Sequence, residues 1–144
     1  MAAALDRYQR IDGLVNNAGA SLHGPLDQGF GRIVNISSGT TRRVAVGVGA
    51  YASSKLAVNM LTAVLRQELA GDSIAVSLLL PSVTATEFGG DMFTLGASPR
   101  PGMVVHSPDY AAGFVLRLLR TGEEAFDIPH GPEQPDLAQA PRSA

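Results

Sequence analysis

The stretch Ile74-Ala75-Val76-Ser77-Leu78-Leu79-Leu80-Pro81 decides the fold class of this 144-residue chain. The run from 74 to 80 is apolar apart from Ser77, and Pro81 ends it, so the pattern predicts a strand that is buried on both faces. Strands that are apolar throughout are typical of parallel sheets whose two faces are covered by helices. The sequence therefore predicts an α/β fold.

The remaining strands are predicted at residues 11–15, a short apolar run, at 32–36, which is rich in β-branched residues, and at 126–128. Adjacent parallel strands need a crossover of about a dozen residues, which is usually a helix. Residues 17–31 are long enough for that crossover, but their four glycines and one proline argue against a helix. One face of the first two strands is therefore expected to lack its usual cover.

Two helices are predicted between and after these strands. Residues 50–70 carry apolar side chains at helical spacing, and Gly71 is expected as the left-handed cap that ends the helix. Ser107-Pro108-Asp109 combines a capping serine, a proline at the first helical position and an early carboxylate, so a second helix is expected from there to about Arg120. The apolar positions of the first helix are Leu56, Met60, Leu61, Val64, Leu65 and Leu69.

Composition excludes several classes of function. The net charge is −2 and 17% of residues are charged, so there is no basic field for nucleic acid. There is no cysteine, and the three histidines, His23, His106 and His130, are scattered, so we expect no metal site. His106 and Arg100 are expected at the surface. No apolar run is long enough for a membrane span and the first residues do not resemble a signal peptide, so we expect a cytoplasmic protein without a membrane partner.

Tyr51 and Lys55 form the strongest candidate pair for chemistry, at the start of the predicted long helix. Their i, i+4 spacing places them on one helix face, and Lys55 is the only lysine among 11 basic residues. A free tyrosine has a pKa of about 10, too high for proton transfer near pH 7. Lowering that pKa by about three pH units takes about 4 kcal/mol, which a cation about 4 Å away can supply. The alternative is a solvated pair at a helix end.

Polar residues also follow two of the predicted strands. Ser37 and Ser38 come directly after the strand at 32–36, and Asn17-Ala18-Gly19 follows the strand at 11–15. The carboxyl ends of parallel strands are where α/β folds bind ligands, and a hydroxyl there could hold a carbonyl oxygen. The alternatives are a turn or cap serine and a plain turn.

Taken together, these segments resemble the short-chain dehydrogenase/reductase family. The resemblance covers nearly all of residues 5–130, and four motifs carry it in the family's order and spacing, with Ser82 where the fourth motif usually has glycine. They are Asn16-Asn17-Ala18-Gly19, Gly31-Arg32-Ile33-Val34-Asn35-Ile36-Ser37-Ser38, Tyr51-Ala52-Ser53-Ser54-Lys55 and Pro81-Ser82-Val83-Thr84-Ala85-Thr86.

The resemblance implies a Rossmann-like, doubly wound parallel sheet and hydride transfer between NAD or NADP and a small carbonyl or alcohol substrate. It implies that Tyr51 is the acid–base, that Lys55 lowers its pKa and binds the nicotinamide ribose, and that Ser38 orients the substrate oxygen. The remaining cofactor-binding positions that it implies are Pro81, Val83 and Thr86 at the nicotinamide end and Asn17, Ala18 and Gly19 beside the adenosine.

The chain departs from the family pattern in its cofactor half. It contains neither the T-G-x-x-x-G-x-G phosphate loop nor the residue that selects NAD or NADP, and the helix that carries a fourth catalytic residue, an asparagine, is absent between the first two motifs. We therefore expect a truncated, incomplete Rossmann-like domain over 1–128 and a loose, proline-rich tail over 129–144. The strand at 11–15 is expected to be an exposed apolar edge, and cofactor binding to be weak or absent.

Three functional hypotheses remain open. The first is an active NAD(P)-dependent oxidoreductase. The second is a catalytically inactive remnant that cannot bind cofactor. The third is an interaction module that pairs with a full-length relative through its bare edge strand and the helix over 50–70, which is also a candidate contact for a homo-oligomer.

Overall fold

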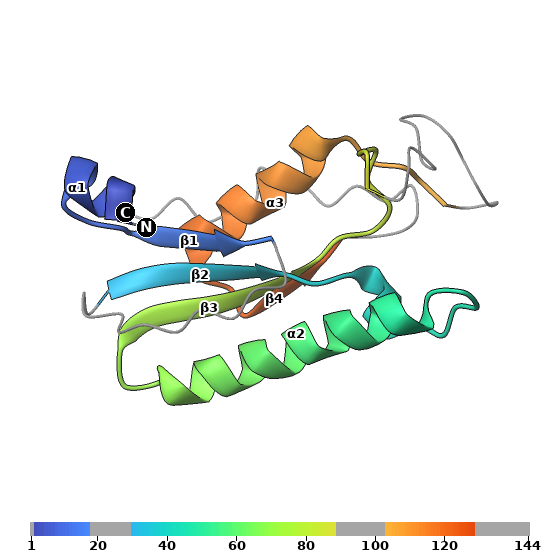
Figure 1. The fold of residues 1–144 in the computed structure, drawn as a ribbon, viewed down its shortest axis with the longest axis horizontal. Helices are drawn as coiled ribbons and strands as arrows, with labels where there is room; N and C mark the ends of the chain where they lie inside the picture. Colours follow the sequence, from blue (N-terminus) through green and yellow to red (C-terminus); the bar gives the residue numbers. More distant parts are fainter. Residues whose placement is uncertain (1, 18–29, 89–102, 129–144) are drawn as a thin grey trace.

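The computed structural model describes residues 2–17, 30–88 and 103–128. Within them lies a four-stranded sheet in the order β1-β2-β3-β4, and every neighbouring pair is parallel (Figure 1). The α/β prediction is therefore confirmed. The strands are β1 (Gly13–Asn16), β2 (Phe30–Ile36), β3 (Ser73–Leu80) and β4 (Ala125–Asp127).

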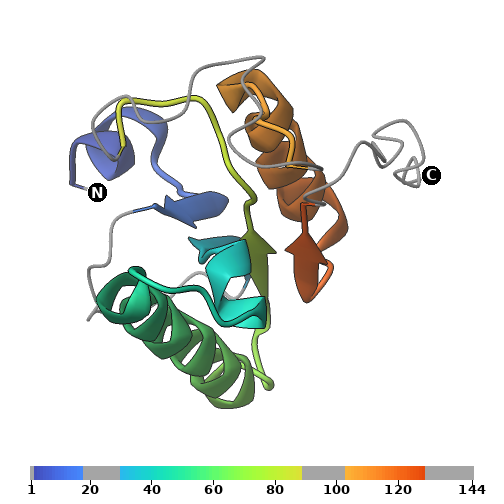
Figure 2. The ribbon, with the colours of Figure 1, turned by 90° about the vertical axis from the view of Figure 1, so that its right-hand side faces the viewer.

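Helices cover both faces of this sheet. The long helix α2 (Gly49–Glu68) lies on one face and α3 (Pro108–Thr121) lies on the other, as Figure 2 shows with the strands seen nearly end-on. A short helix α1 (Ala2–Tyr8) precedes β1, and a 3-10 helix η1 (Gly39–Arg42) follows β2. In the described part of the chain, no helix has both the length and the hydropathy needed to cross a bilayer.

The ends of α3 agree with the sequence prediction, whereas the C-terminal end of α2 differs from it. Ser107 caps α3, accepting a hydrogen bond from the Tyr110 backbone nitrogen at 3.1 Å, and Gly122 ends that helix in the left-handed region at φ 68°. The prediction that Gly71 caps α2 in the same way is wrong. Leu69 is the C-cap, and its backbone N–H bonds back to Leu65 and Gln67, so no left-handed residue is needed.

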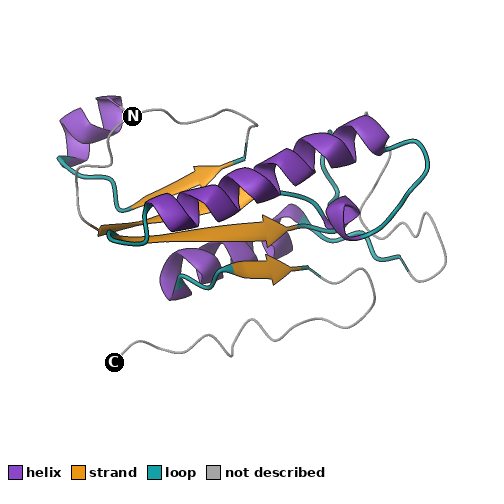
Figure 3. Ribbon diagram, turned by 90° about the horizontal axis from the view of Figure 1, so that it is seen from below, coloured by secondary structure: helices purple, strands orange, loops and turns teal. Residues whose placement is uncertain are grey.

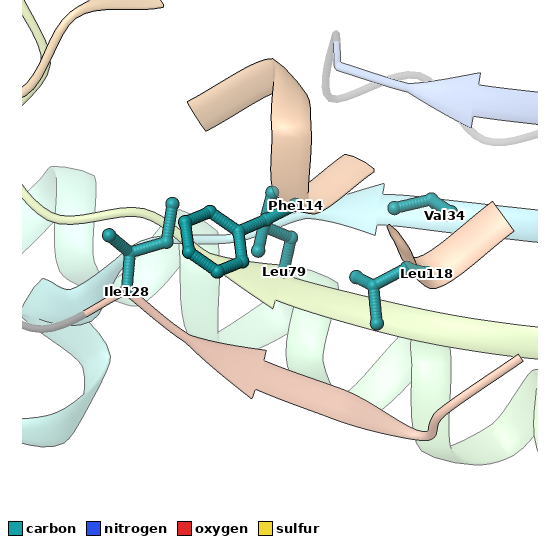
Figure 4. Close-up of a cluster of buried hydrophobic side chains, with 5 residues drawn as sticks. All are labelled: Val34, Leu79, Phe114, Leu118 and Ile128. Carbon is teal, nitrogen blue, oxygen red and sulfur yellow. The ribbon is translucent and has the colours of Figure 1, made fainter. Parts of the chain in front are cut away.

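The main apolar core lies between the sheet and α3. Figure 4 shows its five fully buried side chains gathered between this helix and the strands. The spacing of the two α3 members places both on the helix face that meets the sheet. The five are Val34, Leu79, Phe114, Leu118 and Ile128.

The α2 side of the sheet is more polar. The buried Thr62 hydroxyl accepts a hydrogen bond from Asn35 Nδ2 at 2.9 Å, in the middle of the interface between α2 and β2. Four large apolar side chains of this helix remain exposed, by 36% to 66%; they are Leu56, Met60, Leu61 and Val64 and are called the α2 patch below. Residues 18–29, where the sequence predicts a crossover without a helix, and the tail 129–144 lie outside the described residues.

The strand β1 forms one edge of the described sheet, as expected. It pairs with β2 on one side only, from Gly13 opposite Arg32 to Asn16 opposite Asn35, and Val15 is 41% exposed. It begins two residues later than predicted, at Gly13.

Candidate active site

The candidate catalytic residues meet at the carboxyl ends of β2 and β3. Ser38 follows β2, and the first two turns of α2 bring Tyr51 and Lys55 to the same end of the sheet. The segment 81–86 follows β3 there. Figure 3 shows η1 and the N-terminal end of α2 at the arrowhead end of the strands. This is the edge at which parallel α/β sheets bind ligands.

Ser38 is buried and caps η1. Its Oγ accepts hydrogen bonds from the Thr40 backbone nitrogen at 3.2 Å and from Thr40 Oγ1 at 2.9 Å. The cap interpretation of this serine is thus correct. Both bonds are accepted, however, so among the described residues no group takes the Ser38 hydroxyl proton, which leaves it available to a substrate oxygen.

Lys55 and Tyr51 share one face of α2, as their spacing predicts. The Lys55 Nζ lies 6.0 Å from the centroid of the Tyr51 ring and donates a hydrogen bond to the Ile36 carbonyl at 3.0 Å. Partial burial lowers the pKa of the Lys55 ammonium. The Ile36 carbonyl accepts one of its three N–H donors, and among the described residues the other two remain for a ligand.

The segment after β3 is held by backbone hydrogen bonds on both sides. The Gly39 N–H donates to the Pro81 carbonyl at 2.8 Å, which joins the Ser38 loop to this segment. Residues on the other side form a short parallel bridge: the His106 N–H donates to Val83 and the Ala85 N–H donates to His106, both at 2.9 Å.

His106 is buried, so the expectation of a surface histidine is wrong. Its backbone is tied to the segment after β3, and its ring stacks on Tyr110 with centroids 4.7 Å apart. The backbone bonds join His106 to residues that are more than 20 positions away in the sequence, so no local pattern could have indicated them. Arg100 lies outside the described residues.

The remaining implied cofactor positions are placed only in part. Asn17 follows β1 and is exposed, and Thr86 is exposed with its Oγ1 accepting from the Phe88 N–H at 3.3 Å. The Phe88 ring lies 5.6 Å from the Tyr51 ring, so an apolar side chain stands beside the candidate acid–base. Ala18 and Gly19 lie outside the described residues.

Sequence reasoning named Ser37 but missed Thr41, Asn59 and the hydrogen bonds that join the three behind Ser38. Ser37, Thr41 and Asn59 are joined by hydrogen bonds and tie the Ser38 loop to α2. The one signal that could have found them is the i, i+4 spacing of Lys55 and Asn59 on the helix.

Known proteins resemble this chain in sequence and in fold. The short chain dehydrogenase family matches residues 21–94, just over half of the chain. The glycine betaine reductase ATRR of Emericella nidulans is 32% identical over 83% of this chain and 10% of its own length. The 1,6-dihydroxycyclohexa-2,4-diene-1-carboxylate dehydrogenase of Pseudomonas putida is 33% identical over 62% of this chain and 45% of its own. A short-chain dehydrogenase from Sphingobium yanoikuyae, solved with NADPH, has a TM-score of 0.66 at 25% identity, over 88% of this chain and 61% of that one.

The chain spans less than half the length of these two curated relatives and under two thirds of the solved structure. The matched region 21–94 contains Ser38, Tyr51, Lys55 and the segment after β3. The parallel sheet with a helix on each face is the Rossmann-like arrangement of the solved structure. The chain belongs to the short chain dehydrogenase family.

Proposed function

We propose that this chain is an oxidoreductase that interconverts a small carbonyl compound and its alcohol with NAD or NADP. The observation that carries the proposal is the meeting of Ser38, Tyr51 and Lys55 at one end of the sheet, with the Lys55 Nζ 6.0 Å from the Tyr51 ring. The solved relative with bound NADPH supports the cofactor class.

The described residues fit the nicotinamide and ribose end of such a cofactor. Lys55 has two N–H donors free for ribose hydroxyl groups, and the buried Ser82 Oγ has no hydrogen-bond partner within the described structure. Val83 and Thr86 border the same end, and Asn17, Ala18 and Gly19 are assigned to the adenosine side. When bound, the cofactor supplies or accepts the hydride.

Each side chain then has a distinct task. The Ser38 hydroxyl donates a hydrogen bond to the substrate oxygen and holds it in place. The Tyr51 hydroxyl gives a proton to that oxygen during reduction and takes it back during oxidation. The Lys55 ammonium stabilises the negative charge that remains on the Tyr51 oxygen, because it lies on the same helix face in a partly desolvated position.

The competing proposal is an inactive remnant, in which the residues of this chain do not bind the cofactor by themselves. The sequence has no T-G-x-x-x-G-x-G loop, which would offer backbone N–H groups to the pyrophosphate at a helix N-terminus. Without that anion site the described residues hold only part of a dinucleotide.

A thermal-shift titration with NADH and with NADPH separates the two proposals. A ligand that binds only the folded chain stabilises it by about 2.7 kcal/mol at a concentration of 100 Kd. The oxidoreductase proposal expects a clear rise in Tm at submillimolar cofactor. No rise with either cofactor supports the remnant.

Replacement of Tyr51 tests the catalytic assignment. We expect Tyr51→Phe to abolish NAD(P)H-dependent carbonyl reduction, because the variant keeps the ring and loses the transferable proton. Tyr8→Phe is the matched control, since Tyr8 is exposed on α1 at the other end of β1. Equal activity of the Tyr51 variant and the parent chain would overturn the proposal.

A further inference from the structure

Asn59 stands one helical turn after Lys55 on α2 and connects two parts of the Ser38 loop. The Ser37 hydroxyl donates a hydrogen bond to Asn59 Oδ1, and Asn59 Nδ2 donates to Thr41 Oγ1 at 3.2 Å. The side chain is partly buried against the loop. One amide therefore spans the residues on both sides of Ser38.

Two hydrogen bonds from Thr41 connect the Asn59 amide to the Ser38 backbone. Thr41 Oγ1 accepts from Asn59 and donates its own proton to the Ser38 carbonyl at 2.8 Å, and the Thr41 backbone N–H donates to the same carbonyl at 3.1 Å. A chain of hydrogen bonds thus runs from α2 through Thr41 to the backbone of Ser38.

The donors and acceptors also determine how the Asn59 amide is oriented. Because Thr41 Oγ1 gives its only proton to Ser38, it needs a donor from Asn59, which Nδ2 provides. With the amide in this orientation, its Oδ1 faces Ser37 and accepts the hydrogen bond from the Ser37 hydroxyl. The Lys55 backbone carbonyl is a second acceptor, 3.3 Å from the same Ser37 Oγ.

We propose that Asn59 is a positioning residue, which clamps the Ser38 loop onto α2 and so holds the Ser38 hydroxyl at a set place relative to Tyr51 and Lys55. The role of Asn59 in catalysis rests on the proposed function. The hydrogen bonds by which Asn59 clamps the Ser38 loop do not depend on that function. Tyr51, Lys55 and Asn59 share one rigid helix, so the clamp couples the serine to the element that carries the other two groups.

Amide hydrogen exchange by NMR, measured without cofactor, tests the clamp. Asn59→Leu removes both polar arms of the amide at similar volume, and Thr41→Val removes the hydroxyl at the other end of the second arm. We expect the Thr40 and Thr41 amides to exchange about tenfold faster in either variant, with β3 amides unchanged, which corresponds to the loss of about one hydrogen bond. The Ser38 Cβ chemical shift is expected to move in both.

Two comparisons make the result specific. Asn59→Leu and Thr41→Val act on the same chain of bonds, so the double variant is expected to exchange no faster than the faster single variant. Thr62→Val is the matched control, because it removes a buried hydroxyl of the same helix that is bonded to Asn35 and not to the Ser38 loop. It is expected to leave the Thr40 and Thr41 amides and the Ser38 shift unchanged.

The clamp would be overturned if the Thr40 and Thr41 amides exchange at the parent rate in Asn59→Leu, or if the β3 amides accelerate by the same factor. It would also be overturned if the two substitutions have additive effects on the exchange rates in the double variant. If Asn59→Leu does not fold, Asn59→Asp keeps an acceptor for Ser37 and replaces the donor to Thr41 with a charged carboxylate oxygen, and the same acceleration is expected. A failed cofactor titration would count against the proposed function and leave these exchange rates unaffected.

Discussion

At the scale of single residues, Lys55 has an ammonium group that is partly withdrawn from water. Its Nζ bonds to the Ile36 carbonyl and lies above the Tyr51 ring, and the cost of desolvation lowers its pKa. No carboxylate is paired with it in the described structure. An ammonium that is partly desolvated and has no carboxylate partner lowers the free energy of unfolding. Groups with pKa values shifted in this way occur often at functional sites.

This position of Lys55 predicts a pH dependence of stability. Between the lowered pKa of the folded chain and the ordinary value of about 10.4, the unfolded chain binds more protons, so the free energy of unfolding rises with pH. We expect Lys55→Met to be at least as stable as the parent chain near pH 7, and this advantage to shrink as the pH approaches 10. Urea unfolding of both chains over that range measures it.

Arg43→Met is the control for that experiment. Arg43 is exposed, and arginine side chains in general stay charged up to pH 10, so the difference between this variant and the parent chain is expected to stay constant with pH. A Lys55→Met advantage that is constant or grows as the pH rises would contradict the prediction.

Gly122 allows a second prediction at this scale. Its φ of 68° is unfavourable for other residues, and an added Cβ would lie 3.1 Å from the Ala75 Cβ and 3.3 Å from Arg32 Nε. We expect Gly122→Ala to lower the free energy of unfolding by about 1–3 kcal/mol. Gly71→Ala, at a position with no neighbouring atom within 4 Å and no positive φ, is expected to be neutral or stabilising by up to about 1 kcal/mol. Equal effects of the two substitutions in chemical denaturation would refute the explanation.

At the scale of elements, α3 is held to the sheet by a column of aromatic rings. Tyr110 meets Phe114 edge to face at 5.1 Å, and Phe114 stacks on Phe126 of β4 at 4.6 Å. His106 extends the column from the loop before the helix. Positions 106, 110 and 114 are four residues apart, which aligns them along one side of the helix and its entry.

Truncating the centre of this column is expected to be costly. Phe114 is fully buried, so Phe114→Ala should lower the free energy of unfolding by about 3–5 kcal/mol through lost burial and the cavity left behind. Leu116→Ala on the exposed side of the same helix should change it by less than about 0.5 kcal/mol. Comparable losses from the two substitutions in urea unfolding would show that α3 does not depend on this column.

At the scale of the whole molecule, the two faces of the sheet are covered unequally. The α3 face holds the apolar core, whereas α2 meets the sheet partly through polar bonds and carries the α2 patch on its outer side. The edge strand β1 adds the exposed Val15. Exposed apolar surface of this kind marks interaction sites in many proteins.

We expect the chain to self-associate through the α2 patch. Sedimentation should show species larger than a monomer at micromolar concentration, and Met60→Glu should shift them toward the monomer, because a charge cannot be buried in an apolar contact without a partner. Gln9→Glu adds the same charge at an exposed position after α1, outside α2, and should have little effect. A parent chain that sediments as a clean monomer would argue against this contact and against pairing with a full-length relative.

Much of this fold could be predicted from local patterns. Short apolar or β-branched segments marked four strands, the spacing of apolar residues marked α2, and Ser107-Pro108 marked the start of α3. Tyr51 and Lys55 could be paired because the helix period places them on one face. Boundaries moved by one or two residues, since pairing with β2, and not hydropathy alone, decides where a strand such as β1 begins.

The sequence by itself determined the α/β class, the family motifs and the candidate residues Ser38, Tyr51 and Lys55, because these depend on short-range periodicity and spacing. Only the tertiary structure decided that His106 is buried and that Asn59 reaches Ser37, 22 residues away in sequence. Such contacts form when distant segments pack, and their geometry depends on the whole sheet. For this reason the groups of the candidate active site could be named from the sequence, whereas the bonds that hold them in place could not.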